Sequence, residues 1–440
     1  MRPPPDMDSS TFVRRLRDVV GTARPRSTSP VSHAVSDVRT DRDLKRVLRG
    51  EWRSWSGASC FVVERRQEPS ARHGRDPVGT IAARFAEGSA GAALIAGGRP
   101  ARPPFLFLDL ETTGLSGGAG THAFLVGCGW FDVNGAFVTR QFLLTRYADE
   151  RELLAAVTEE IATVGALVSF NGKSFDAPVL ETRYSFHRLE WIGASLPHID
   201  VLHPARRFWG MRESCSLTVL ESEILGARRV DDVPGFEIPG RYFQFVRSGD
   251  ARPLVDVLEH NRLDLLSLAG LTARLLELVR LGPGSARDAG EALALGAVYA
   301  RAGLPARARE AYTTAIAAST RLPAVRIEAL RALAPLLRRD RRYDQAAACW
   351  QLLVSVRGCP AHIVREATEA LAIHHEHRVR DFAAAKAFAL RSLDAGEHAR
   401  WTEAVRHRLA RIQKKMGKSE VSGLKFDGES PQTPNLRLET

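Results

Sequence analysis

The sequence contains no hydrophobic run that approaches the length of a membrane span, so we expect no membrane-spanning segment. Its first residues include Pro3-Pro4-Pro5 and lack the apolar core of a signal peptide. The five cysteines are scattered, and no two of them form a Cys-x-x-Cys pair. This usage argues against a disulfide framework and against a zinc ribbon, and it is typical of reduced thiols in a cytoplasm. We therefore expect a cytoplasmic protein that does not associate with membranes.

Two short stretches resemble ligand-binding motifs but lack their defining features. The glycines between 114 and 120 have neither Walker spacing nor a following Lys-Ser or Lys-Thr, which argues against a nucleotide phosphate loop. The sequence His374-His375-x-His377 has the composition of a metal site, but it falls inside a helical repeat. We expect neither stretch to bind a phosphate or a metal ion.

The charge of the chain is unevenly distributed. The 440 residues include 44% hydrophobic and 26% charged residues, an ordinary globular composition with room for two or three domains. The net charge is +11, yet residues 105–281 hold 17 Lys and Arg against 23 Asp and Glu, a balance of −6. The remainder therefore carries +17. A polyanionic partner is one explanation, and an Arg-rich composition with solvated faces is the other.

Changes in composition divide the chain into five segments. The first and last are polar tails expected to be largely disordered, and a short helix is expected at 11–20 in the first tail. The segments are a basic tail at 1–50, a β lead-in packed on the next domain at 51–102, an α/β domain at 103–282, helical repeats at 288–416 and a tail at 417–440.

The α/β domain is predicted from its periodicity. A strand meander comes first, joined through Val133-Asn134-Gly135, a strong hairpin signal, and strands then alternate with helices. This order predicts a mixed α/β sheet. Strands are expected at 105–110, 123–131, 136–144 and 166–170, and helices at 150–164, from Asp176, at 216–225 and at 253–281.

The segment from 288 to 416 repeats a pattern of small and aromatic residues. Ala308, Ala346 and Ala385 occupy equivalent positions and lie 38 and 39 residues apart. Two helices per unit with this spacing fit the tetratricopeptide pattern, although its usual period is about 34 residues. The sequence therefore predicts an all-α domain of tetratricopeptide-like repeats.

Two carboxylates stand at the end of the first strand of the α/β domain. Asp109 and Glu111 are two residues apart after an apolar run that starts at Phe105. Because strand side chains alternate between faces, both point the same way. Two neighbouring buried carboxylates repel each other, and a divalent cation with oxygen ligands would make them favourable. The alternative is an edge strand with a solvated acidic end.

Two further acidic positions follow downstream. Asp176 comes after a strand end and an Asn171-Gly172 turn, and it would start a helix. Taken alone, Asp176 fits a helix N-cap better than a ligand. His260 and Asp264 are four residues apart on the long helix and share one of its faces. Taken alone, this pair fits a local surface contact.

Taken together, the three motifs are more specific. Asp-x-Glu on a first strand, Asn-Gly-x-x-Phe-Asp after a later strand and an Asp on a late helix resemble the DEDD superfamily of 3′→5′ exonucleases. The chain is most similar to the YprB-type ribonuclease H-like family over about residues 51–281, and its helical repeats also match that architecture. The resemblance implies a ribonuclease H-like mixed sheet with flanking helices, followed by an all-α tetratricopeptide-like domain.

The resemblance also implies roles for individual residues. Carried over position by position, it makes two Mg²⁺ or Mn²⁺ ions the cofactors and His260 the residue that orients or deprotonates the attacking water. The spacing of His260 to the last acid departs from the family pattern, because it is that of the subgroup that uses Tyr. The implied metal ligands are Asp109, Glu111, Asp176 and Asp264, and the implied substrate contacts are Thr112, Thr113, Leu115 and Asn171.

The sequence thus predicts a metal-dependent nuclease, expected to be a 3′→5′ exonuclease that acts on a single-stranded end of DNA or RNA. The helical repeats would dock a protein partner or support the nuclease fold. A rival hypothesis is a non-catalytic scaffold that keeps the fold and binds partners through its repeats. A decayed enzyme would be expected to lose metal carboxylates, and all four acids are present.

Overall fold

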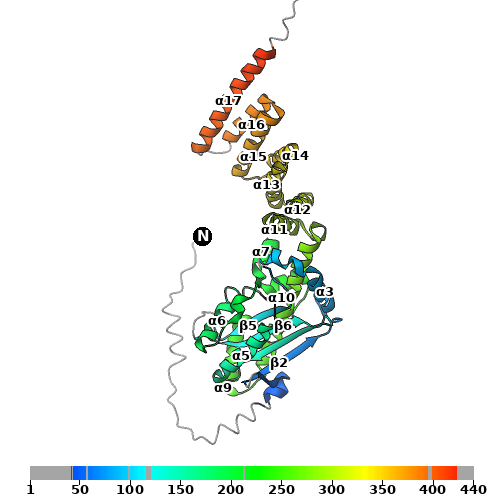
Figure 1. The fold of residues 1–440 in the computed structure, drawn as a ribbon, viewed down its shortest axis with the longest axis vertical. Helices are drawn as coiled ribbons and strands as arrows, with labels where there is room; N and C mark the ends of the chain where they lie inside the picture. The colour runs from blue at the N-terminus through cyan, green and yellow to red at the C-terminus, as the bar shows by residue number, and fades with distance from the viewer. Residues whose placement is uncertain are drawn as a thin grey trace, which may run out of the picture.

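The computed structural model describes residues 41, 43–55, 58–97, 100–114, 120–211, 214–394 and 399–423. An α/β domain forms one end of the molecule, and a column of helices rises from it (Figure 1). Among the described residues, no helix combines the length and the apolar character needed to cross a bilayer. The short helix expected at 11–20 lies outside the described residues.

The α/β domain is built on a seven-stranded mixed sheet. The strand order is β1-β2-β7-β6-β5-β8-β9, in which β8 is parallel to both β5 and β9 and the other pairs are antiparallel. The predicted hairpin joins β6 to β7, with Gly135 at a φ of 80°. The strands are β1 (Glu51–Trp55), β2 (Ala58–Gln67), β5 (Phe105–Thr112), β6 (Ala123–Phe131), β7 (Phe137–Leu143), β8 (Ala166–Ser169) and β9 (His198–Asp200), and β3 (Arg72–His73) pairs with β4 (Asp76–Pro77) separately.

The amino-terminal segments differ from expectation. The predicted lead-in supplies two strands of the main sheet itself, because β2 pairs with β7 along its length and buries Phe61 and Val63. Residues 43–48 form a helical turn inside the segment that was expected to be a disordered tail. Leu44 and Leu48 are buried there and belong to the core. Burial of these two leucines explains why the turn is ordered.

Helices cover both faces of the sheet. On one face, α3 and most of α10 share a core with Phe105 and Phe107 of β5. On the other face, α5, α6 and α9 share a core with Leu106 and Leu108. The helix expected at 216–225 is a short α-helix that continues as a π turn at Glu221–Leu225. The helices are α3 (Val78–Gly88), α4 (Ala92–Ile95), α5 (Glu150–Ala162), α6 (Asp176–Phe186), α7 (Leu202–Trp209), α8 (Leu217–Leu220), α9 (Ile238–Ser248) and α10 (Leu254–Leu281).

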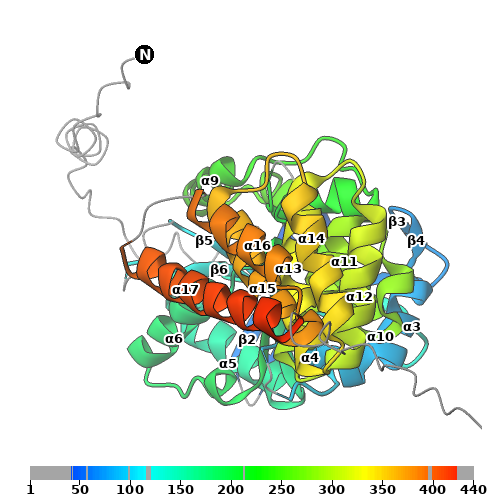
Figure 2. The ribbon, with the colours of Figure 1, turned by 90° about the horizontal axis from the view of Figure 1, so that it is seen from above.

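The carboxy-terminal region is entirely helical among its described residues, and seen from above its helices lie over the α/β domain (Figure 2). Ala308, Ala346 and Ala385 are buried at matching places in α12, α14 and α16. The last helix extends to Gly423, so it includes the start of the tail expected from 417. The helices are α11 (Ala289–Arg301), α12 (Pro305–Ala318), α13 (Pro323–Arg339), α14 (Tyr343–Ser355), α15 (Ala361–His374), a π turn (His375–Val379), α16 (Phe382–Asp394) and α17 (Ala399–Gly423).

Buried polar contacts join the column to the α/β domain. The carboxylate of Glu291 at the start of α11 accepts hydrogen bonds from Arg274 at 2.7 Å and from the Trp209 indole at 3.0 Å. The Tyr299 hydroxyl donates to the carbonyl of Val279 at 3.0 Å. One apolar core runs without interruption from the sheet through α10 into α11 to α15.

Candidate metal centre

Strand alternation sets the direction of the first two acids. Phe105 and Phe107 belong to the core under α10, whereas Leu106 and Leu108 belong to the opposite core. The odd-numbered residues of β5 therefore face α10, and Asp109 and Glu111 continue that series toward the carboxyl end of the strand. Helix α10 crosses this face of the sheet, so its polar side chains meet the two carboxylates.

One group of possible metal ligands is found among the described residues, and it consists of Glu111, His260 and Asp264. One ligand atom from each residue lies within 4.8 Å of the others. His260 and Asp264 face the sheet from neighbouring turns of α10, with Nε2 and Oδ2 3.4 Å apart. The histidine therefore stands among the acids, whereas the sequence suggested only that it would act on a water molecule.

Asp109 and Asp176 do not belong to this close group but lie within electrostatic reach of it. The pKa of Asp109 is raised well above its usual value by burial and then by the negative charges of Asp264, Glu111 and Asp176. Burial, followed by the charges of Asp264 and Asp176, likewise raises the pKa of Glu111. All four predicted ligands therefore contribute to one region of negative potential, in which each carboxylate disfavours the ionisation of another.

Asp176 opens α6 but does not cap it. The helix begins after Phe175 and has no side-chain cap. The turn that precedes α6 is held by Asp200, whose carboxylate accepts the backbone N–H groups of Asn171 and Lys173 at 2.8 and 3.1 Å. Asn171 itself has a φ of 66°, as expected at a tight Asn-Gly turn. Burial and then the charge of Asp200 raise the pKa of Asp176 to about 7.

Asn261 connects the acidic strand to the helix. Its Nδ2 donates to Oδ2 of Asp109 at 2.8 Å, and its Oδ1 accepts from Gln141 of β7 at 2.8 Å. A Cβ on Gly127 of β6 would lie 2.2 Å from the same Oδ1. The absence of a side chain at 127 therefore lets α10 approach the sheet closely enough to hold Asp109.

We expect Gly127→Ala to destabilise the protein by ~1–3 kcal/mol, because overpacking at this contact displaces Asn261 and leaves the Asp109 carboxylate without its donor. Urea unfolding at neutral pH measures the change. Gly240→Ala is the matched control, since a Cβ there meets no atom within 4 Å. Equal stability of the Gly127 variant and the wild type would contradict this role of the glycine.

The sequence did not point to three residues that surround the ligand group. Arg229 forms ion pairs with Asp264, with Glu221 at 2.7 Å and with Asp232 at 3.1 Å. Asp232 in turn lies 2.8 Å from Nδ1 of His260. These residues stand on a π turn and the loop that follows it, where no periodicity constrains position. The only feature of the sequence that could have indicated these residues is an arginine close to several acidic residues before the long helix.

The predicted substrate contacts lie beside the acids or outside the described residues. The Thr112 hydroxyl donates to the carbonyl of Gly114 at 3.0 Å, and the Thr113 hydroxyl accepts the N–H of His122 at 3.0 Å. Both threonines therefore shape the turn that leaves β5. Leu115 lies outside the described residues.

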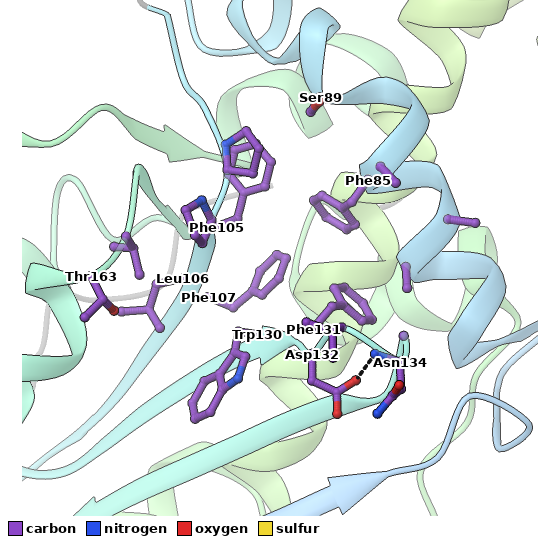
Figure 3. Close-up of a pocket in the computed structure, with 18 of the residues that line it drawn as sticks. Phe85, Ser89, Phe105, Leu106, Phe107, Trp130, Phe131, Asp132, Asn134 and Thr163 are labelled. Atoms are coloured by element: carbon purple, nitrogen blue, oxygen red, sulfur yellow. Dashed lines mark hydrogen bonds between the residues drawn. The ribbon is translucent and has the colours of Figure 1, made fainter.

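A separate cavity of about 800 Å³ lies toward the amino end of β5. Several aromatic side chains line it, among them Phe85, Phe107 and Trp130 (Figure 3). At its rim, Asp132 accepts the N–H of Asn134 at 2.9 Å within the hairpin between β6 and β7. None of the predicted site residues lines this cavity, so it is distinct from the acidic group.

The donor set of the acidic group fits a hard divalent cation. Carboxylate oxygens are the ligands that Mg²⁺ and Mn²⁺ prefer, and a cation would offset the burial and the mutual repulsion that together raise the pKa of Asp109 and Glu111. In the present structure the Arg229 guanidinium provides part of this compensation at Asp264.

A mixed sheet crossed by a helix, with carboxylates gathered where they meet, defines a ribonuclease H-like domain. The family model for the RNase_H superfamily matches residues 106–276. The chain is also 32% identical over 321 residues to a protein of Bacillus subtilis (strain 168) named uncharacterized protein YprB, which covers 70% of this chain and 74% of that protein. The chain therefore belongs to the YprB family, with a domain of the RNase_H superfamily.

Proposed function

We propose that this chain is a metal-dependent nuclease that hydrolyses phosphodiester bonds. The observation that carries the proposal is the group formed by Glu111, His260 and Asp264, with Asp109 and Asp176 within electrostatic reach. Buried acids that raise one another's pKa cost stability, which is a reason to expect a function for them. Membership of the RNase_H superfamily supports a nucleolytic role.

Four carboxylates would hold the cofactor, two ions of Mg²⁺ or Mn²⁺. These ligands are Asp109, Glu111, Asp176 and Asp264, and Asn261 keeps the first of them in place. When bound, a pair of such ions stabilises the attacking and the leaving oxygen of a phosphodiester. Because the Arg229 guanidinium contacts Asp264, it would have to leave that carboxylate or share it with a bound ion.

His260 would orient or deprotonate the attacking water. Its Nδ1 lies 2.8 Å from Oδ1 of Asp232. A hydrogen on Nδ1 would therefore form a hydrogen bond to that carboxylate, and Nε2 would keep its lone pair. Nε2 is the ring nitrogen that lies near Asp264. Asp232 would therefore act as a positioning residue that selects the tautomer suited to a general base.

The direction of cleavage follows from the family resemblance. We propose 3′→5′ exonuclease action on a single-stranded end, with Thr112, Thr113, Leu115 and Asn171 near the terminal nucleotide. The turn that the two threonines shape leaves β5 beside Glu111, which is consistent with that role. We place the nuclease domain at 103–282, to whose sheet β1 and β2 of the preceding segment add two strands, and a tetratricopeptide-like domain at 288–416. Close packing of Gly296 against the Tyr312 ring supports such repeats.

The test is incubation of the purified chain with single strands of DNA and of RNA labelled at the 3′ or the 5′ end, with Mn²⁺ or with EDTA. We expect the 3′ label to be released first and EDTA to stop the reaction. If no strand is cut with either metal, while the protein is folded and binds Mn²⁺, the nuclease proposal fails and the scaffold hypothesis replaces it.

A further inference from the structure

A second cavity, of about 420 Å³, opens in the helical column between α13, α14, α15 and the π turn that follows α15. Its lining includes Arg338, Tyr343, Trp350, His377 and Arg378. A shallower hollow continues from it, shares Tyr343 and Arg378, and adds two more arginines. We call these two hollows together the arginine groove, and its four arginines are Arg338, Arg341, Arg342 and Arg378.

The arginines of this groove have no acidic partner among the described residues. Many other arginines of the chain form ion pairs, as Arg331 does with Glu366 and Arg411 with Glu376. Within the groove, the Arg378 guanidinium lies over the Tyr343 ring, 3.8 Å from its centroid, and the Asp344 carboxylate lies 3.7 Å from the His374 ring rather than against an arginine. The single acid in the lining is Asp344, which stands 97% exposed. Four positive charges against one negative charge leave a site suited to an anion.

The π turn holds one wall of the groove in place. The carboxylate of Glu376 is fully buried and accepts hydrogen bonds from Arg411 at 2.6 Å and from Lys415 at 2.8 Å. These hydrogen bonds connect the π turn to α17. The neighbouring residues His377 and Arg378 are therefore available to the groove, and both line it. A π turn of this kind is often found at functional sites.

The charge of the two parts of the chain points to a polyanion. Residues 289–416 hold 22 Lys and Arg against 12 Asp and Glu, a balance of +10, whereas residues 105–281 carry −6. The segment with the metal carboxylates therefore repels the phosphates of its proposed substrate at long range. The helical column can supply the missing attraction.

We infer that the arginine groove binds single-stranded nucleic acid and holds the strand whose end is cut in the α/β domain. Phosphates would contact the exposed arginines, and bases would stack on Tyr343 or on the outer face of the Arg378 guanidinium. An acidic peptide would satisfy the charges as well, but it offers no flat ring for this pair. The inference rests on the proposed nuclease function, for which it names the site that retains the substrate.

The test is fluorescence anisotropy of the full chain with labelled 30-nucleotide single strands of DNA and of RNA, in EDTA, so that binding is measured without cleavage. We compare the wild type with Arg341→Gln combined with Arg378→Gln, and with Tyr343→Leu. The control combines Arg321→Gln with Arg357→Gln, which removes the same charge from exposed positions outside the groove. Circular dichroism checks that each variant is folded.

We expect the double groove variant to bind at least about tenfold more weakly and to lower the slope of log K against log salt by about 1.4, or about 0.7 for each lost phosphate contact. Tyr343→Leu should weaken binding by roughly five- to a hundredfold, the usual effect of losing one stacked base. The control pair should change affinity less than about twofold.

Three results would overturn the inference. Equal losses in the groove and control variants would mean that only overall charge attracts the strand. Displacement by polyglutamate as effective as by unlabelled strand, with no effect of Tyr343→Leu, would identify an acidic-peptide site instead. If the groove variants keep the wild-type affinity and still cleave, this inference is wrong and the nuclease proposal is unaffected. If the chain binds the strand through the groove but never cleaves it, the nuclease proposal is wrong and binding by the groove is unaffected.

Discussion

Replacement of Asp264 by Asn is expected to reduce metal-dependent cleavage below detection, whereas His260→Ala should leave a measurable remainder. The Asp264 carboxylate belongs to the ligand group, so its loss removes a charge that would hold a dication. His260 is assigned to the water, and a general base contributes about a hundred- to ten-thousandfold. Single-turnover cleavage of a labelled strand, with Mn²⁺ well above saturation, measures both variants.

The contrast between the two variants also tests the place of His260 in the ligand group. If His260→Ala loses Mn²⁺ affinity as severely as Asp264→Asn, then the imidazole is a ligand and the role on the water is wrong. If His260→Ala cuts at the wild-type rate, the histidine has no part in the mechanism. His260→Tyr is informative as well, because a spacing of four from Asp264 is that of the Tyr-containing subgroup.

The second large effect concerns stability without metal. Asp176→Asn should be more stable than the wild type at pH 8 in EDTA, by a few kcal/mol at most (of the order of 1.4 kcal/mol per pKa unit). Burial and the charge of Asp200 raise the folded-state pKa of Asp176 from 3.8 to about 7. The folded protein therefore favours the protonated carboxyl, and ionisation destabilises it progressively as the pH rises through that range. Asparagine stays neutral and removes this penalty.

The measurement is urea unfolding of both proteins in EDTA between pH 5.5 and 8. The stability advantage of Asp176→Asn should grow as the pH rises across this window. Asp344→Asn is the matched control at an exposed position and should show no such trend. A difference that stays constant with pH would mean that the charge on Asp176 does not oppose folding. Addition of Mn²⁺ should stabilise the wild type more than the variant.

The parts of the site that follow from regular periodicity could be predicted from the sequence. The alternation of β5 gives the shared direction of Asp109 and Glu111, and helical spacing brings His260 and Asp264 together. Local patterns sufficed here because each relation lies within one element.

Relations between distant elements could not be predicted in this way. Nothing in the sequence near Gly127 indicates that Asn261 fills the space above it, because the contact depends on how α10 crosses the sheet. Arg229 reaches Asp264 from an irregular loop, where backbone direction has no sequence period. The surroundings of Asp176 also depend on another strand, because Asp200 at the end of β9 holds the turn that precedes α6.

The continuous core has a consequence for how the chain folds as a unit. The apolar cluster that includes Phe105 and Phe107 of the sheet extends through α10 as far as Leu371 in α15, and Glu291 anchors both Arg274 and Trp209 across the junction. The boundary near residue 282 therefore separates two kinds of secondary-structure arrangement, but the residues on its two sides share one hydrophobic core. Removal of the helices would expose the part of this core that lies at the junction, where Trp209 of α7 and Arg274 of α10 would lose their partner Glu291, so we expect the two parts of the chain to unfold cooperatively.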